Sequence, residues 1–215
     1  MSAHLEFNLN NLHERCEEVN PLDAKSTVLS LTAKLKKYED IYALSAPQIG
    51  IKQRVVCIKY KDGIIKEYIN PVPLKAEEFH FVREKDISIP EKEFIAARPT
   101  KITLRYQSVD AKPEENILKG AVAEVFDRMM MYLDGVTLDE FGLEVDEEFD
   151  DASKEDKDKI LDMYIKSLKN RESILNDNIE HDEDAKELKD AIRFMEAVDK
   201  GEVTLGDPSL LIDKK

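Results

Sequence analysis

The chain has 215 residues and a formal net charge of −14, from 46 acidic and 32 basic residues. This length allows one domain with a sizeable core and an appendage. The acidic balance argues against a nucleic-acid or anionic-membrane partner, because both bind basic patches. With two cysteines, no signal-peptide pattern and no apolar run long enough to span a bilayer, we expect a soluble, reduced, cytoplasmic protein.

The first part of the chain reads as strands flanked by helices. Apolar residues recur at helical spacing over residues 23–42, and Lys61-Asp-Gly63 predicts a hairpin turn. Four segments have the composition of strands: 54–60, 66–70, 78–83 and 101–107. A further helix over about 116–133 ends near Gly135, a favoured residue just past a helix end. Strands followed by a helix packed on them predict an α+β domain.

Composition changes after Leu138, where residues 139–151 include acids and no basic side chain. We therefore expect a domain over 1–138, an acidic linker over 139–152 and an appendage over 153–215. A capping box at Ser153 opens one amphipathic helix, and a second is predicted over 182–200. Together they predict a helical hairpin that is followed by an apolar tail. The apolar faces of the two helices must pack on each other, on the first domain or on another chain.

The predicted helix over 116–133 has the residue spacing of a helical metal-binding motif, but it lacks the side chains that would bind the metal. Two imidazoles four residues apart on a helix can share one ion, with an acid beside the first as general base. Those positions hold Arg128, Tyr132 and Met129. Arg128 has no lone pair to donate, and Met129 cannot transfer a proton. The pattern predicts no metal, no cofactor and no general base at this position.

Upstream segments occur in a fixed order that extends this pattern. They are Ala46-Pro-Gln48, Arg83 to Pro90 with Ser88-Ile-Pro90 at its end, and Arg98-Pro-Thr. In order and spacing, from about residue 12 to 145, the chain resembles the peptide deformylases, which remove the formyl group from the N-terminal methionine of new chains. The resemblance implies antiparallel sheets around a central helix.

The resemblance also implies a former active-site pocket with altered side chains. Gln48 matches the family glutamine that helps bind the formyl oxygen, whereas the metal-binding cysteine falls on Asp86. The two histidine ligands fall on Arg128 and Tyr132. The catalytic glutamate and the leading glutamine of the same motif fall on Met129 and Asp127.

These substitutions predict a polar plug in place of a metal. An anion, a cation and a phenol now stand at the ligand positions, so we expect an ion pair between Asp86 and Arg128 with the Tyr132 hydroxyl nearby. The alternative is an opened pocket in which the three groups are solvated independently.

Two function classes remain open at this stage. The loss of three ligands and a base favours a non-catalytic protein that binds another protein as a scaffold or assembly module. By analogy with diverged deformylase-like genes of tailed bacteriophages, it would be a tail, baseplate or other virion component. The second class is a hydrolase with altered or metal-free chemistry in the same cleft, using Gln48, Asp86, Tyr132 and Asp127.

Overall fold

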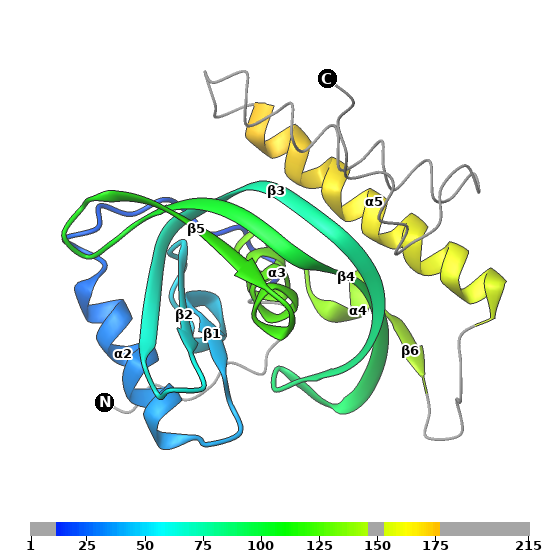
Figure 1. Ribbon diagram of the computed structural model, residues 1–215, viewed down its shortest axis with the longest axis horizontal. Coiled ribbons are helices and arrows are strands. Elements are labelled where there is room, and N and C mark those ends of the chain that lie inside the picture. The colour runs from blue at the N-terminus through cyan, green and yellow to red at the C-terminus, as the bar shows by residue number, and fades with distance from the viewer. Residues whose placement is uncertain (1–11, 146–152, 177–215) are drawn as a thin grey trace.

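A long hairpin, formed by the strands β3 and β4, organises the fold. The computed structural model describes residues 12–145 and 153–176 (Figure 1). Within them lies one 6-stranded antiparallel sheet in the order β1-β2-β3-β4-β5, with β6 paired to β4. The strands are β1 (Ala43–Ser45), β2 (Val55–Lys59), β3 (Ile65–Asp86), β4 (Ile89–Gln107), β5 (Pro113–Lys119) and β6 (Leu143–Val145).

The hairpin bends because its register is interrupted. Shifts occur between Ile69 and Val72 and between Pro73 and Lys75, and such bulges increase the local bend and twist of a strand pair. One end of the hairpin carries β2 and β5, and the other carries β6. The sheet therefore curls around a central helix, α3 (Figure 1).

Helices cover both faces of the curled sheet. They are α2 (Lys25–Lys37), the 3-10 helix η1 (Ala46–Ile49), α3 (Ala121–Leu133), α4 (Leu138–Phe141) and α5 (Lys154–Asn176). Helix α3 lies inside the curl, and its buried side packs on Tyr68, Ile102 and Leu104. Helix α2 packs Leu31 and Leu35 against β2. Methionines 129 to 131 are all buried, as expected of flexible side chains that fill a core.

The predicted α+β class is confirmed, but some element bounds were wrong. The helix expected over 116–133 begins only at Ala121, because residues 113–119 form β5 and Gly120 takes a φ of 57°. The two strands expected over 66–70 and 78–83 are parts of the single strand β3. The helix expected over 23–42 ends at Lys37, where the next residue is extended.

The segment that follows helix α4 joins the sheet as strand β6. Strand β6 pairs with Phe94 and its neighbours on β4, so the segment predicted as a linker over 139–152 begins with ordered structure. The capping box expected at Ser153 is confirmed: Asp156 N donates to Ser153 Oγ at 3.1 Å. The second helix expected over 182–200 and the apolar tail lie outside the described residues. The division into domains stays a prediction.

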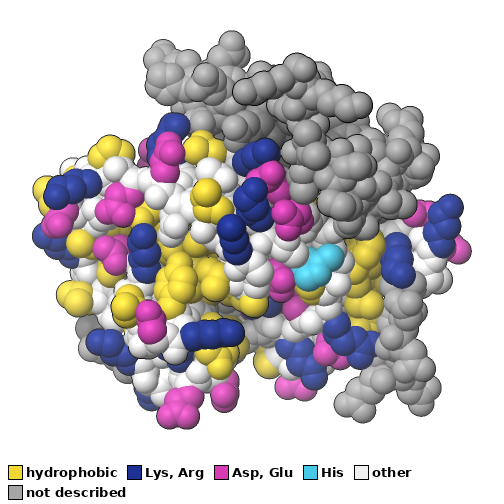
Figure 2. Space-filling model, viewed as in Figure 1, with side chains coloured by type: hydrophobic (Ala, Val, Ile, Leu, Met, Phe, Trp, Pro, Cys, Tyr) yellow, Lys and Arg dark blue, Asp and Glu magenta, His cyan; other side chains and the backbone are white. Residues whose placement is uncertain are grey.

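The described surface mixes charges of both signs. Figure 2 shows acidic and basic side chains interleaved on the visible face, around an apolar patch. No helix among the described residues has the length and apolar character needed to cross a membrane.

A tight contact after α3 predicts a large effect of a small substitution. Gly135 has a φ of 76°, and a Cβ added there would lie 2.7 Å from the His13 carbonyl oxygen. We expect Gly135→Ala to lower the free energy of unfolding by about 2–4 kcal/mol, through backbone strain and overpacking. Urea unfolding measures the loss. Gly63→Ala is the matched control, since Gly63 also has a positive φ of 83° but nothing within 4 Å of its Cβ position. Equal losses in the two variants would contradict the contact.

Two buried thiols predict a loss of stability at alkaline pH. Burial raises the pKa of Cys16 and of Cys57 from 9.0 to about 12. The unfolded chain releases these protons first, so the stabilisation is complete below pH 9.0 and is lost as pH rises toward about 12. Each thiol contributes a slope of up to about 1.4 kcal/mol per pH unit. In urea unfolding across this range, Cys57→Ala should reduce the slope, and an unchanged slope would contradict the assignment.

Candidate active site

The turn between β3 and β4 points a carboxylate at helix α3. Asp86 is the last residue of β3 and pairs with Ile89 across the turn. Its Oδ1 accepts a hydrogen bond from the backbone N of Ser88 at 2.8 Å, which fixes the carboxylate as in an Asx turn. The other oxygen, Oδ2, faces Arg128 on α3. The turn thus fixes the direction of the carboxylate.

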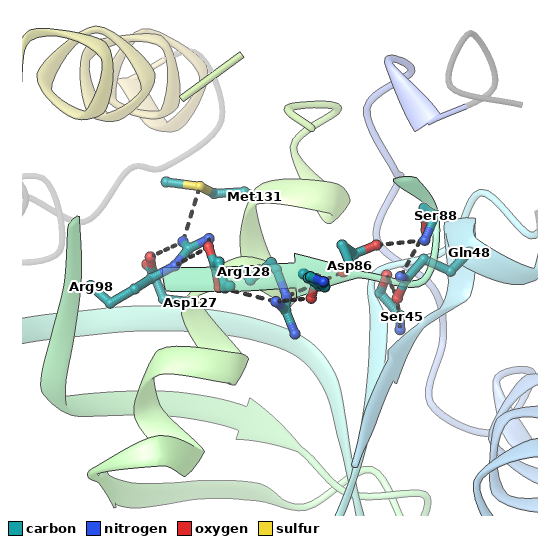
Figure 3. A network of polar contacts seen from close by, with 10 residues as sticks. Ser45, Gln48, Asp86, Ser88, Arg98, Asp127, Arg128 and Met131 are labelled. Atoms are coloured by element: carbon teal, nitrogen blue, oxygen red, sulfur yellow. Dashed lines mark hydrogen bonds and ion pairs between the residues drawn. The ribbon is translucent and has the colours of Figure 1, made fainter. Parts of the chain in front are cut away.

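Arg128 joins the turn to the helix. Its Nη1 donates to Glu84 Oε2 at 3.0 Å and to the Lys85 carbonyl oxygen at 3.1 Å. Its Nε lies 3.2 Å from Asp86 Oδ2, close enough for an ion pair but not aligned for a hydrogen bond. Both side chains are largely buried, with 14% exposure for Arg128 and 2% for Asp86. The predicted ion pair is confirmed, and the alternative of independently solvated groups is wrong (Figure 3).

Arg98 is a second, fully buried cation that the sequence analysis did not assign to the site. Its Nε and Nη2 donate to Glu84 Oε1 at 3.1 Å and 2.5 Å, and its Nη1 donates to Asp127 Oδ2 at 2.8 Å. The guanidinium also lies over the Phe141 ring, 4.4 Å from the centroid. Burial alone would lower the pKa of Arg98, but the carboxylates of Glu84 and Asp127 raise it above its usual value. Arg98 therefore stays charged, with Glu84 shared between it and Arg128.

Tyr132 lies beside the ion pair, with its hydroxyl near the Asp86 carboxylate but without the geometry of a hydrogen bond. The side chain is fully buried, and its hydroxyl has no hydrogen-bond partner among the described residues. Burial, and then the negative charge of Asp86, raise the pKa of Tyr132 well above its usual value. The phenol is therefore neutral at ordinary pH and keeps its proton as a hydrogen-bond donor.

Gln48 is held within the protein by its own neighbours. Its Oε1 accepts hydrogen bonds at 3.1 Å from both the backbone N and the Oγ of Ser45, and its Nε2 donates to Ser88 Oγ at 3.1 Å. These bonds connect η1 to the turn that carries Asp86 (Figure 3). Ser45 and Ser88 are thus supports of the site that its motifs alone did not identify.

A small pocket opens at this place. Its volume is about 110 Å³, and four of the six predicted site residues line it, namely Gln48, Asp86, Arg128 and Met129. Apolar side chains supply much of the remaining wall: Ile41, Tyr42, Ile87 and Val125. Asp127 and Tyr132 do not line it: Asp127 faces Arg98, and Tyr132 is fully buried beside the ion pair. The pocket can hold a small group against one carboxylate and one guanidinium.

The relation to known proteins follows from the first two thirds of the chain. The family model described as polypeptide deformylase matches residues 4–142. This chain belongs to the polypeptide deformylase family. The peptide deformylase of Thermotoga neapolitana is 31% identical over 130 residues, which cover 59% of this chain and 78% of that protein.

Solved structures of deformylases share the fold. The crystal structure of the peptide deformylase from Thermotoga maritima superposes with a TM-score of 0.58 and 27% identity, covering 63% of this chain and 94% of that one. The deformylase of the Vibrio parahaemolyticus bacteriophage VP16T, in complex with actinonin, has a TM-score of 0.56 and 24% identity, covering 62% of this chain and 97% of that one. The latter likeness concerns the fold alone.

These comparisons correct the predicted function. The interpretation as a non-catalytic scaffold or assembly protein, and as no enzyme, is contradicted, because the family and the relatives carry the name of an enzyme. The inference counted lost metal ligands. Such losses show that the site differs from its relatives, and they do not show that activity is absent.

The side chains present do not fit the metal that deformylases are expected to bind. A guanidinium, a carboxylate and a neutral phenol replace the three ligands, and the guanidinium repels a divalent ion. Across residues 12–145 and 153–176, no group of three or more His, Cys, Asp and Glu side chains is placed to hold a metal ion. We therefore derive no catalytic step through a metal.

Proposed function

We propose that this chain is a deacylase of the deformylase family that hydrolyses the formyl amide at a peptide N-terminus without a metal. The observation that carries the proposal is the pair formed by Asp86 and Arg128 on the wall of the pocket, in a chain that matches the deformylase family. The apolar wall suits the side chain of an N-terminal methionine.

Arg128 supplies positive charge to the reacting oxygen. Its Nη1 is fixed by Glu84 and the Lys85 carbonyl oxygen, and these are the hydrogen bonds found between this guanidinium and the described residues, so Nη2 makes none with them. A donor held in this way can stabilise the negative charge that develops on the formyl oxygen when water attacks. The fixed half of the guanidinium keeps the free half in place.

Asp86 is the carboxylate that can accept a proton from the attacking water. In this step the water oxygen bonds to the formyl carbon, its proton passes to Asp86, and the C–N bond breaks. The proton then passes to the leaving amine, which yields formate and a free N-terminus. Because no Lewis acid lowers the pKa of the water, we expect turnover to be slow.

A hydrolysis assay tests the proposal. Purified protein is incubated with an N-formyl-methionyl tripeptide, and formate and free amine are measured with chelator present and then with Zn²⁺, Ni²⁺ or Fe²⁺ added. We expect slow release of both products at a rate that the chelator does not change. No release under any condition would overturn the proposal, and release only with added metal would overturn its metal-free chemistry.

Arg128→Met gives a sharper expectation for the same reaction. Methionine keeps the length of the side chain but removes the donor, so kcat/KM should fall about 10²- to 10³-fold, as for the loss of an oxyanion donor. Initial rates with the formyl tripeptide measure the loss. Arg83→Met is the control, since Arg83 pairs with Glu93 at the surface, outside the pocket. A loss below threefold in Arg128→Met, or an equal loss in the control, would exclude the proposed role.

Other expectations remain predictions. An origin in a tailed bacteriophage rests on the sequence analogy alone, because the likeness to the VP16T deformylase concerns only the fold. A cytoplasmic location, a protein partner and the lack of nucleic-acid or membrane contacts rest on the sequence alone.

A further inference from the structure

Helix α5 lies outside the matched family segment and yet packs on the back of the site. The family model ends at residue 142, and α5 begins at Lys154. Ile160 and Tyr164 are fully buried in the core cluster that contains Phe79, and the rings of Phe79 and Tyr164 meet edge to face with centroids 5.5 Å apart. Figure 1 shows α5 running along the outside of the β3 and β4 hairpin. The helix is therefore docked by an apolar face.

A polar contact crosses this apolar interface. The Tyr164 hydroxyl lies 3.4 Å from both carboxylate oxygens of Asp127, which places it to donate to that carboxylate. The distance is long for an O–H···O bond, so the contact is weak by itself. It reaches, however, a carboxylate that is 5% exposed and already holds a buried arginine.

From Asp127 the contacts continue without interruption to the pocket. Asp127 Oδ2 accepts from Arg98, and Arg98 donates to Glu84 Oε1. Glu84 Oε2 accepts from Arg128, on the pocket wall (Figure 3). Groups linked in a buried network polarise and orient one another. Since Glu84 holds one arginine with each oxygen, a shift of Arg98 moves the acceptor of Arg128.

We propose that α5 is a positioning element of the active site and that Tyr164 is its positioning residue. The Tyr164 hydroxyl fixes Asp127, and the orientation passes through Arg98 and Glu84 to Arg128. The effect on catalysis rests on the proposed function, whereas the effect on the arginine side chains does not. Docking of α5 thereby controls the orientation of the Arg128 guanidinium relative to the pocket.

Tyr164→Phe in the full-length protein tests this directly. The substitution keeps the ring against Phe79 and removes only the hydroxyl. We expect the Nε–Hε cross-peaks of Arg98 and Arg128 to move in ¹H–¹⁵N spectra while that of Arg54, which pairs with Asp134, stays in place. With the formyl tripeptide, kcat should fall about fivefold with KM unchanged, because the donor is misplaced in the transition state.

Tyr60→Phe is the matched control. It also removes a tyrosine hydroxyl, whose 2.5 Å hydrogen bond to the Tyr68 hydroxyl lies outside the network. We expect the two arginine cross-peaks to stay unchanged. If Tyr164→Phe also leaves them unchanged, the inference is overturned. Absence of turnover in the wild type would count against the proposed function alone, since the spectra still decide this point.

A second variant covers the case in which Tyr164→Phe does not fold. Ile160→Ala loosens the docking of α5 without touching the polar network. Hydrogen exchange at the Nε–Hε group of Arg98 should become faster, because local opening of α5 admits water to the guanidinium. Unchanged exchange in this variant would show that α5 does not protect the network and would overturn the inference.

Discussion

Arg98→Met is expected to lower the free energy of unfolding by about 3–5 kcal/mol, the loss typical when one partner of a buried ion pair is removed. The arginine is fully buried and holds two carboxylates, those of Glu84 and Asp127. Methionine fills the space but removes the cation held by Asp127 and leaves Glu84 paired with Arg128 alone. Urea unfolding at neutral pH measures the loss.

Two variants separate this electrostatic effect from loss of packing. Arg105→Met removes an arginine from the same strand, where the pair with Glu115 is exposed at 3.6 Å, so it should change stability by less than about 1 kcal/mol. Adding Asp127→Asn to Arg98→Met should recover part of the loss, because the carboxylate that Arg98 held is then neutral while Glu84 keeps its pair with Arg128. If this double variant is less stable than Arg98→Met, packing and not charge explains the effect.

Restoring the family ligands is expected to convert the site into a metal centre. Asp86→Cys, Arg128→His, Met129→Glu and Tyr132→His together place a thiolate and two imidazoles around one point, a donor set that binds zinc. We expect the fourfold variant to retain about one equivalent of Zn²⁺ after gel filtration. The parent protein should retain none. Elemental analysis of both gives the answer.

The decisive control keeps the arginine. A threefold variant with Asp86→Cys, Met129→Glu and Tyr132→His still has the Arg128 guanidinium within the site, so it should retain no metal. Should it load zinc as well as the fourfold variant does, the guanidinium does not exclude the ion. Stoichiometric metal in the parent protein would contradict the fit of the site more directly.

The ion pair at the site could be predicted because Asp86 and Arg128 have opposite charges and fall on two motif positions that the resemblance brings close together in space. Asp86 and Arg128 are 42 positions apart, yet the motif order alone placed them together, and the structure agrees. The hydrogen bonds of Gln48 to Ser45 and Ser88 could not be predicted from the sequence, because they depend on the detailed backbone path of η1 and of the turn.

Arg98 could not be assigned from its sequence context. Its partners lie 14 and 29 positions away, and an arginine in a strand reads as exposed unless those partners are known. A weak signal exists, since Arg98 directly follows the apolar run from Phe94 to Ala97. Strand β5 was missed for a related reason: only its pairing with β4 distinguishes it from the start of a helix.

The predicted function was wrong because the prediction depended mainly on the loss of metal-dependent catalysis. A count of lost ligands concerns metal-dependent catalysis alone. It does not take into account that the Arg128 guanidinium lies beside the Asp86 carboxylate. The comparisons place the chain in a family whose relatives carry the name of an enzyme.

The turn that carries Asp86 also has a kinetic consequence. Strands β3 and β4 pair from Asp86 and Ile89 at the turn out to Ile69 and Gln107, so the ladder can close from its shortest loop outward. Loop closure is cheapest there, and hairpins that zip from a tight turn form within microseconds. Substitutions of Asp86, whose carboxylate accepts a hydrogen bond from Ser88 within this turn, are therefore expected to change the rate at which the hairpin closes.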